Sequence, residues 1–455
     1  MPYFSNRTLI SQTPQKVGQE VRLFGWVNSV RDHGKLVFVD LRDRSGLVQL
    51  VGSREKLGKL KSETVIMLEG EVKKRPEKLV NPKISTGKIE VAVENLEILS
   101  PAKELPFDIY GTGRKINEDL RLKYRYLDLR RPRLANNLFL RHQLLQAFRQ
   151  TLVAHGFWEI ETPNLSKSTP EGARDFLVPS RLQPGKFYAL PQSPQQYKQL
   201  LMVAGFERYF QIATCFRDED LRADRQLEFK QVDLEMSFVD REEVLNEVEK
   251  IIIEVMGEMK APILKVPFPR LTYKEAMEKY HSDKPDLRLK KNGEKLAFAW
   301  VIDFPLFEKT PQRMIAPVHH PFTSPNPEDL PLLEKDPLKV RSWQYDLVLN
   351  GQEVGGGSIR ITDPQIQEKV FAILGHSKEE IKEKFGHLLK AFEYGVPPHG
   401  GIAFGFDRLT AILTGEESIR EVIAFPANTA GKTAVMDAPS VVSEEQLKEL
   451  GIKIR

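Results

Sequence analysis

Residues 216–238 read FRDEDLRADRQLEFKQVDLEMSF, and the second half of this stretch predicts a β-strand with two chemically different faces. Side chains alternate between the faces of a strand, so one face is apolar and is formed by Val232, Leu234, Met236 and Phe238. The opposite face is a row of acceptors: Gln231, Asp233, Glu235 and Ser237. A second strand is expected before this one, and Arg217 follows it on the face of the acceptors. We therefore expect this arginine to meet the carboxylates. A half-solvated hairpin and a functional site are both compatible with this stretch alone.

Composition places the chain among globular proteins of two or three domains. Of its 455 residues, 41% are hydrophobic, which is ample for at least one large core. The net charge of +4 permits nucleic-acid binding without indicating it. Cys215 is the only cysteine, which excludes an intramolecular disulfide and a cysteine-rich zinc site. Neither an apolar signal region nor a long apolar run is present, so we expect a cytoplasmic protein with no membrane partner.

Residues 20–100 contain five mostly alternating apolar runs, separated by glycines or charged turns. This pattern indicates a small Greek-key barrel of the oligonucleotide-binding type. Arg31 and Gln49 are among its polar positions, and Phe38 lies in a strand beside them. Cations beside an aromatic ring are what unpaired bases need, although Phe38 fits the barrel core equally well.

A basic run, LRLKYRYLDLRRPRL, leads into an amphipathic helix and then into a strand halted at Pro163. The apolar excess of this unit favours pairing with a second copy of the chain. The next polar segment is typical of a mobile lid and carries Glu171. A helix then begins near Ser193, with Gln195 and Lys198 near its start, where an anion is favoured although a solvated lysine is the commoner case.

Asn350-Gly351 is the strongest two-residue turn signal in the chain and predicts a hairpin. The register of that turn places Asp346 opposite Gly355, so that Asp346 and Glu353 share a face. Two carboxylates so close need a counter-cation, and oxygen ligands beside a polyphosphate are what Mg²⁺ prefers. Arg360 has the opposite parity and shares this face only if the glycine run bulges or the strand bends.

The stretch YGVPPHGGIAFGFDRLTAILTG predicts an apolar strand that runs into a short helix with Arg408 in its first turn. A helix N-terminus with an arginine suits a phosphate group. Adjacent His319 and His320 do not indicate a metal site, because neighbouring positions cannot share one face. A substrate-contacting or structural histidine fits this pair better.

Together these segments resemble class II aminoacyl-tRNA synthetases over nearly the whole chain, and most closely the bacterial type of aspartyl-tRNA synthetase. The basic run through ETPNL is similar to motif one, FRDED…RQLEFKQVDLEMSF to motif two, and GIAFGFDRL to motif three. STPEGARDF, QSPQQYKQ, HHPFT and EVGGGSIRI are similar to the aspartate-specific segments. The resemblance implies an α+β fold with a five-stranded anticodon-binding barrel (1–103), a linker (104–130) and a catalytic domain (131–455) whose antiparallel sheet is flanked by helices.

The same resemblance implies ATP and Mg²⁺ as cofactors, and L-aspartate, tRNA-Asp and a second copy of the chain as partners, with no DNA. The catalytic residues would be Arg217, Arg408 and Glu353. The aspartate site would comprise Glu171, Gln195, Lys198, Arg217, Asp233, His319 and Arg360. The ATP site would comprise Arg217, Asp218, Glu219, Gln226, Glu353, Gly405, Phe406, Asp407 and Arg408. The magnesium ligands would be Asp346 and Glu353, and the anticodon contacts Arg31, Phe38 and Gln49.

The chain departs from the family pattern in two places. The insertion domain usual between motifs two and three is reduced to a short turn near residues 287–297. His33 matches the residue type of members that charge both tRNA-Asp and tRNA-Asn, but Lys78 does not match the small residue they usually carry nearby. Charging of tRNA-Asn is therefore left open.

Two other functions compete with aspartate–tRNA ligation: a catalytically silent RNA-binding paralogue, and an ammonia-dependent asparagine synthetase on the same core. The presence of Arg217, Glu353 and Arg408 argues against the first, and the barrel argues against the second. Glu235 has no assigned role, and is either a second acceptor in the pocket or the structural partner of a neighbouring arginine.

Overall fold

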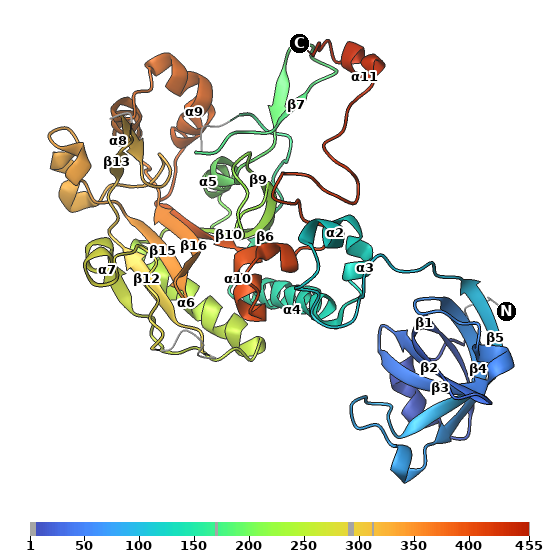
Figure 1. The fold of residues 1–455 in the computed structure, drawn as a ribbon. Coiled ribbons are helices and arrows are strands. Elements are labelled where there is room, and N and C mark those ends of the chain that lie inside the picture. Colours follow the sequence, from blue (N-terminus) through green and yellow to red (C-terminus); the bar gives the residue numbers. More distant parts are fainter. Residues whose placement is uncertain (1–5, 169–171, 290–294, 312–313, 455) are drawn as a thin grey trace. The chain divides into compact units, whose positions relative to one another are not determined.

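The structure is a computed structural model that describes residues 6–168, 172–289, 295–311 and 314–454. The chain divides into two compact units, residues 1–108 and 109–455, each with its own hydrophobic core (Figure 1). Two short helices occupy part of the expected linker, so residues 118–128 belong to the second unit. Among the described residues, no helix has the length and apolar content that crossing a membrane requires.

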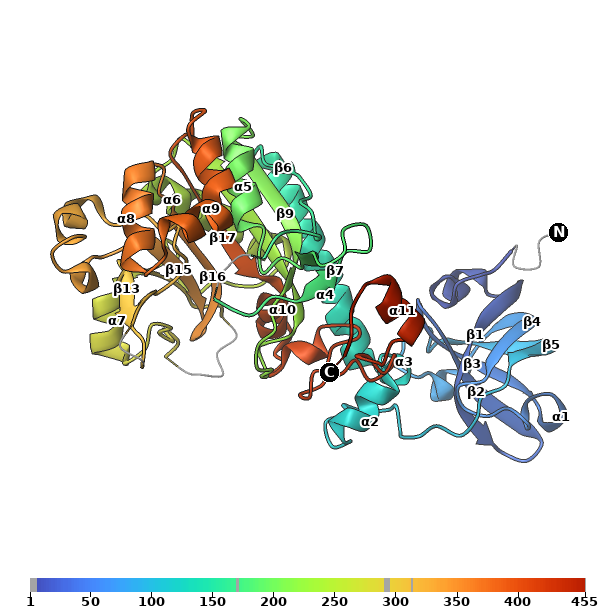
Figure 2. The ribbon, with the colours of Figure 1, turned by 90° about the horizontal axis from the view of Figure 1, so that it is seen from above.

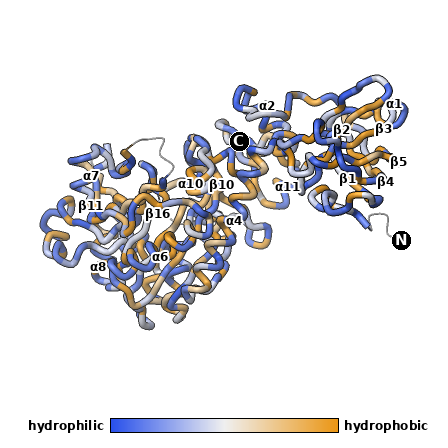
Figure 3. Tube along the Cα trace, turned by 90° about the horizontal axis from the view of Figure 1, so that it is seen from below, coloured by the Kyte–Doolittle hydropathy of each residue, from blue (hydrophilic) through white to orange (hydrophobic). Residues whose placement is uncertain are grey.

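In the first unit the described strands form one closed barrel with the order β1-β2-β3-β5-β4, as expected from the five alternating runs. Val37, Val39 and Leu41 of β2 are fully buried in its interior because alternate side chains of a barrel strand point inward. Hydrophobic residues lie along these strands and hydrophilic ones in α1 (Figure 3). The elements are η1 (Ile10–Lys16), β1 (Glu20–Asp32), β2 (Leu36–Asp43), β3 (Gly46–Ser53), α1 (Arg54–Leu57), β4 (Val65–Lys74), η2 (Glu77–Leu79) and β5 (Ile89–Ser100).

The second unit is built on a mixed sheet with the order β11-β12-β15-β16-β17-β10-β9-β6 among the described strands. Pairing is antiparallel from β12 to β9 and parallel at the two edges. The sheet strands are β6 (Trp158–Glu159), β9 (Arg208–Phe216), β10 (Glu228–Ser237), β11 (Arg270–Thr272), β12 (Phe298–Ile302), β15 (Gln344–Leu349), β16 (Gln352–Ile359) and β17 (His399–Gly405). Two separate hairpins are formed by β7 (Leu177–Pro179) with β8 (Phe187–Ala189), and by β13 (Phe307–Lys309) with β14 (Ile315–Pro317).

Helices cover both faces of this sheet. The apolar face packs against α4, α6 and α10, which contribute Phe148, Val248 and Leu409 to one core with Leu234 of β10. On the opposite face lies α5, with α9 beside it (Figures 1 and 2). The helices are α2 (Glu118–Lys123), α3 (Arg125–Asp128), α4 (Pro132–Ala154), α5 (Gln195–Val203), α6 (Arg241–Glu258), α7 (Tyr273–Tyr280), η3 (Pro327–Leu332), η4 (Pro337–Lys339), α8 (Pro364–Ile373), α9 (Lys378–Phe392), α10 (Phe406–Thr414), η5 (Ile419–Glu421) and α11 (Glu444–Glu449).

The expected hairpin over residues 216–238 is present as β9 and β10. Val232, Leu234 and Met236 are buried in the core, as the alternation predicts. The prediction for Phe238 is wrong, because β10 ends at Ser237 and Phe238 is 65% exposed with a φ of 59°. The chain leaves the sheet at this point and turns toward α6. The strand expected before Pro163 is also shorter, since β6 contains only Trp158–Glu159.

The Asn350-Gly351 turn forms the expected hairpin, but its register differs by one residue. The pairing shifts after Glu353, so that Asp346 lies opposite Gly356 rather than Gly355. This bulge leaves Val354 without an opposite residue and changes the parity of the rest of β16. Because of this bulge, Arg360, which directly follows β16, lies on the same face of the sheet as Asp346.

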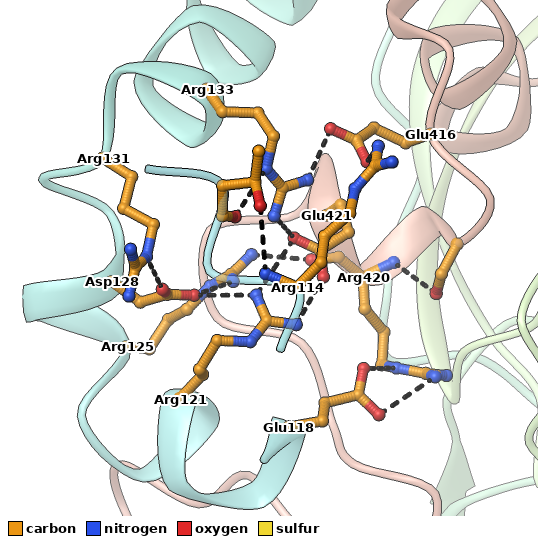
Figure 4. Close-up of polar contacts among 12 residues, drawn as sticks. Arg114, Glu118, Arg121, Arg125, Asp128, Arg131, Arg133, Glu416, Arg420 and Glu421 are labelled. Carbon is orange, nitrogen blue, oxygen red and sulfur yellow. Dashed lines mark hydrogen bonds and ion pairs between the residues drawn. The ribbon is translucent and has the colours of Figure 1, made fainter. Parts of the chain in front are cut away.

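The basic run before α4 is folded into the protein rather than solvated (Figure 4). The fully buried Asp128 carboxylate accepts hydrogen bonds from Arg121 at 3.1 Å, Arg125 at 3.1 Å and Arg131 at 2.6 Å. Arg121 also pairs with Glu421 of η5 at 2.8 Å. These buried charges hold the start of the second unit against the segment that follows α10.

Replacement of Gly357 is expected to destabilise the second unit, because its Cβ would lie 2.1 Å from the Gly401 carbonyl oxygen. Gly357→Ala should lower the free energy of unfolding by about 3 kcal/mol, since the neighbouring backbone cannot yield. The matched control is Gly257→Ala in α6, where nothing lies within 4 Å and alanine should add up to about 1 kcal/mol. Urea denaturation of both variants measures the difference, and equal stabilities would contradict the packing described for β16 and β17.

Candidate active site

Two buried carboxylates on the polar face of β10 are paired with two buried cations from other elements. The Nζ of Lys198, on α5, lies 3.0 Å from Asp233 Oδ1 and 3.3 Å from Glu235 Oε2. The guanidinium of Arg360 donates to Glu235 Oε1 at 2.8 Å and to Oε2 at 2.9 Å. All four residues are at most 3% exposed. Lys198 is therefore not the solvated lysine of a first helical turn, and Glu235 is the partner of both cations.

We call this buried group the charge quartet; it consists of Lys198, Asp233, Glu235 and Arg360. The charges of its members influence one another's pKa values. Burial raises the pKa of Glu235, but Arg360 and Lys198 outweigh it and lower that pKa to about 2. Burial raises the pKa of Asp233 against the opposing charge of Lys198. Lys198 donates to Asp233 Oδ2 at 3.2 Å and also lies 3.0 Å from Oδ1. Because Oδ1 receives no well-directed hydrogen bond from the described residues, it can also accept from a bound donor.

His319 and His320 adjoin the charge quartet as neutral groups. Burial and the charge of Arg360 lower the pKa of His319 to about 3. The ring of His320 lies 2.8 Å from Arg360, measured from Nε2 to Nη1. Both imidazoles are consequently uncharged at physiological pH, so the positive charge of the pocket comes from Lys198 and Arg360.

Beside the quartet is a cavity of about 210 Å³ that collects most of the residues expected to hold ATP. Its lining includes Arg217, Glu219, Gln226, Glu353, Gly405, Asp407 and Arg408. Asp218 and Phe406 are not in this lining: Asp218 pairs with Arg174 at 3.5 Å, and Phe406 is buried against Arg141. The fold therefore places cationic and anionic side chains around one cavity, at the ends of β10, β16 and β17.

Arg217 does not meet the carboxylates of β10, and that expectation is wrong. Its guanidinium lies over the ring of Phe229, 5.2 Å from the centroid, and its Nε donates to the Gln192 carbonyl at 3.4 Å. Arg217 keeps the alternation of β9, because its N–H donates to the Leu227 carbonyl at 2.9 Å and its side chain shares the face of Phe229. Leu227 is six residues before Asp233, so Arg217 lies too far along the sheet to contact the carboxylates. Arg217 thus stands in the cavity, and the carboxylate row is neutralised by other residues.

Arg408 and Gln226 are both held by the main chain. Arg408 donates from Nη1 to the Glu353 carbonyl at 2.6 Å and pairs with Asp224 at 3.2 Å. The buried amide of Gln226 accepts from the Ala427 N–H at 2.9 Å and donates to its carbonyl at 3.2 Å. Asp224 and Ala427 were not foreseen as cavity neighbours, because only the fold brings these segments together.

Asp346 and Glu353 converge over Gly356. A Cβ on this glycine would lie 3.3 Å from Asp346 Oδ1 and 3.5 Å from Glu353 Oε1. Burial and the charge of Glu353 raise the pKa of Asp346 well above its usual range. Two carboxylates that repel each other at close range suit a magnesium ion. In proteins this ion usually binds one or two carboxylates and completes its coordination shell with phosphates and water. Within the described ranges, no cluster of three or more His, Cys, Asp or Glu residues forms a metal site.

On the barrel, Arg31 and Phe38 lie on the outer face of β1 and β2, whereas Gln49 of β3 is buried beside them and donates to Glu90 at 2.8 Å. Arg31 lies opposite Phe38 in the sheet, pairs with Asp40 at 2.7 Å and donates to Gln49 at 3.3 Å. Phe38 is half-buried and is not part of the barrel core, and its ring meets His33 with centroids 5.4 Å apart.

Three other expected residues have simpler placements. Lys78 is exposed in η2. Gln195 is buried at the start of α5 and donates to Gln199 at 3.1 Å. Glu171 lies outside the described residues.

The chain combines a barrel that carries cations and an aromatic ring with a sheet whose end holds paired arginines and carboxylates. This combination is the class II synthetase architecture. Residues 117–429 match the model "tRNA synthetases class II (D, K and N)", and residues 21–99 match the model "OB-fold nucleic acid binding domain". The chain belongs to this class II tRNA synthetase family.

Individual relatives agree with this placement. The chain is 46% identical to the aspartate–tRNA(Asp/Asn) ligase of Caldanaerobacter subterraneus over 96% of both chains, and 44% identical to that of Dictyoglomus turgidum. The first alignment spans 571 positions, more than the 455 residues present here, so that relative contains sequence that this chain lacks. Among solved structures, asparaginyl-tRNA synthetase from Pyrococcus horikoshii has the same fold, with a TM-score of 0.74 at 23% identity over 93% of this chain and 98% of that one.

Asp346→Asn is expected to stabilise the protein at pH 7 but to leave its stability nearly unchanged near pH 3, when no divalent cation is present. The raised pKa of Asp346 means that the folded chain keeps this proton to higher pH than the unfolded chain does. Wild-type stability is therefore lost as pH rises from about 4 through the folded-state pKa, whereas the amide loses none.

Urea denaturation in a chelating buffer at pH 3.5 and pH 7 measures this difference. Asp336→Asn, which removes a surface partner of Lys339, serves as the control and should shift stability by less than about 0.5 kcal/mol at either pH. A difference between wild type and Asp346→Asn that does not grow with pH would contradict the electrostatic conflict described here.

Proposed function

We propose that the protein is an aspartate–tRNA ligase that activates L-aspartate with ATP and transfers it to the 3′ end of tRNA-Asp. The observation that carries this proposal is the charge quartet, which combines two buried cations with two acceptors in one pocket. The identity of relatives named as aspartate–tRNA ligases over 96% of the chain supports it. We place this reaction in the cytoplasm, with the other components of translation.

The quartet suits an amino acid with a second carboxylate. Lys198 and Arg360 would pair with the side-chain carboxylate of aspartate, while Asp233, Gln195 and Glu171 would accept from its ammonium group. Asp233 Oδ1 supports this assignment, because it faces Lys198 but accepts no hydrogen bond within the described residues. An amide in place of the carboxylate would give up charge-assisted bonds to Lys198 and Arg360 and would turn its own NH₂ donors toward these cations, which makes asparagine a poor substrate. Neutral His319 would close the pocket without adding charge.

The cavity residues suit the polyphosphate and the adenosine of ATP. Arg217 would hold the α-phosphate and the reacting carboxylate, Arg408 the γ-phosphate, and Glu219 and Gln226 the adenosine. Asp346 and Glu353 would hold Mg²⁺, which when bound neutralises phosphate charge. Gly405 and Asp407 line the same cavity, whereas Asp218 and Phe406 would act only through their neighbours.

The reaction needs no protein nucleophile. The aspartate carboxylate attacks the α-phosphorus in line, the bond to the β-phosphate oxygen breaks, and pyrophosphate leaves. The ribose hydroxyl of the tRNA then attacks the aspartyl carbonyl and AMP leaves. Catalysis rests on positioning and on the charge that Arg217 and Arg408 place at the phosphates.

The outer barrel surface would read the anticodon through Arg31, Phe38 and Gln49. An aromatic ring beside an ion-paired arginine offers stacking for an unpaired base. The relatives' printed names include tRNA-Asn, and His33 beside Phe38 supports charging of both tRNAs, whereas Lys78 argues against it.

A homodimer is supported by exposed apolar side chains on α4 and β6. Phe139, Val153 and Trp158 are each at least 60% exposed in the single chain. Burying them against a second copy would remove a large apolar area from water.

An asparagine synthetase or a silent paralogue remains less well supported. The barrel keeps its exposed cationic and aromatic surface, which an enzyme that makes free asparagine does not need. Arg217, Glu353 and Arg408 meet in one cavity, which a catalytically silent protein would have no reason to retain.

Aspartate-dependent exchange of pyrophosphate into ATP tests this function most simply. Exchange should occur with aspartate and be lower by about 100-fold or more with asparagine, because an amide cannot accept charge-assisted bonds from both Lys198 and Arg360 as a carboxylate does. Charging of tRNA-Asp and tRNA-Asn transcripts then separates the two tRNA specificities. Absence of exchange with aspartate, from protein that is folded and binds ATP, would overturn the proposal.

A further inference from the structure

The segment after α7 is docked on the tip of the β15–β16 hairpin. Arg288 pairs with Asp286 at 2.7 Å and donates to the Asn350 carbonyl at 3.4 Å. Asp286 also packs against Gly351, since a Cβ on that glycine would lie 3.2 Å from the Asp286 Cβ. Residues 282–288 are thus positioned by the same hairpin that carries Glu353.

Lys284 extends from this docked segment to the carboxylate pair. Its Nζ lies 3.4 Å from Glu353 Oε2, and its backbone N–H is held by Ser282 Oγ at 3.0 Å. The side chain of Lys284 is 41% exposed, so it is free to change its rotamer. The main-chain carbonyl of Glu353 is held by Arg408 from the cavity side. Glu353 therefore stands between two cations, of which only Lys284 contacts its carboxylate.

This contact cannot persist unchanged when a divalent cation occupies Asp346 and Glu353. The ion would neutralise the Glu353 carboxylate and repel an ammonium group held beside it. The nearest new anions would be the phosphates held at Arg408. A lysine is suited to this exchange, because its three donors sit on a compact charge at the end of a flexible chain.

We propose that Lys284 is a phosphate-binding residue: it neutralises Glu353 in the empty site and turns to the phosphate oxygens of ATP and of departing pyrophosphate when the carboxylates hold a divalent cation. The inference rests on the proposed function for the identity of the nucleotide. Lys284 is a binding residue in this role, and no bond to it forms or breaks.

Calorimetric titration of ATP with Mg²⁺, without aspartate, tests the role apart from the overall activity. Lys284→Met should weaken ATP binding about tenfold, the size of one lost charge-assisted contact. Lys284→Arg should keep most of the affinity because a guanidinium also binds phosphate. The control, Lys279→Met, removes an exposed lysine of α7 that pairs only weakly with Glu275 and should bind like wild type.

Pyrophosphate exchange separates this role from a structural one. In Lys284→Met the KM for ATP should rise about tenfold while the KM for aspartate changes less than about twofold. Unchanged ATP affinity would overturn the inference, and so would an equal loss for both substrates with a lowered melting temperature in chelating buffer. A wild-type protein that binds ATP but does not activate aspartate would overturn the proposed function, while the titration would still decide the role of Lys284.

Discussion

The pocket depends on one buried electrostatic arrangement, in which Glu235 holds Arg360 bidentately and shares Lys198 with Asp233. Removing one member would leave an uncompensated charge in the interior, at a cost of about 3–5 kcal/mol. Replacing buried pairs by apolar residues can be neutral, so the quartet is retained for recognition more than for stability. The sheet accommodates it because Gly401 has no Cβ, which would lie 2.2 Å from Glu235 Oε2.

A second buried charge system has a different consequence. Asp128 and its three arginines are not among the residues that line the cavity, and they tie the start of the second unit to η5. The η5 segment in turn supports the loop between β9 and β10, since Ile419 N donates to the Ala223 carbonyl at 2.9 Å. Arg420 reaches the Arg222 carbonyl at 3.2 Å from the same segment. Buried charge outside the cavity lining thus helps to position the loop that contains Asp224 and Gln226.

Local patterns were sufficient to predict the elements and several site residues. The alternation in residues 216–238 indicated an apolar and an acidic face, and Asn350-Gly351 correctly indicated a hairpin. The five runs of the barrel were predicted for the same reason, because strand alternation is visible over short distances. The resemblance to a synthetase added the cavity residues, most of which the fold does bring together.

What remained hidden depends on contacts between distant segments. Glu235 and Arg360 are 125 residues apart, and a single bulge at Val354 decides which face Arg360 joins. Arg217 lies on the predicted face but opposite Leu227, too far along the sheet to contact Asp233, and alternation alone does not give that separation. Lys284 carries no local signal, since an exposed lysine after a helix is ordinarily solvated. Its proximity to Glu353 arises only when the segment docks on the hairpin tip.

Binding of non-reactive adenylate analogues would show whether the buried cations select a carboxylate side chain. Calorimetry would compare a sulfamoyl analogue of aspartyl-adenylate with the matching asparaginyl analogue, on the wild-type protein and on Lys198→Met. The wild type should prefer the aspartyl form by about 100-fold or more, and the variant should lose most of this preference while still binding ATP. Equal affinity of the wild-type protein for both analogues would show that the charge quartet does not select the carboxylate.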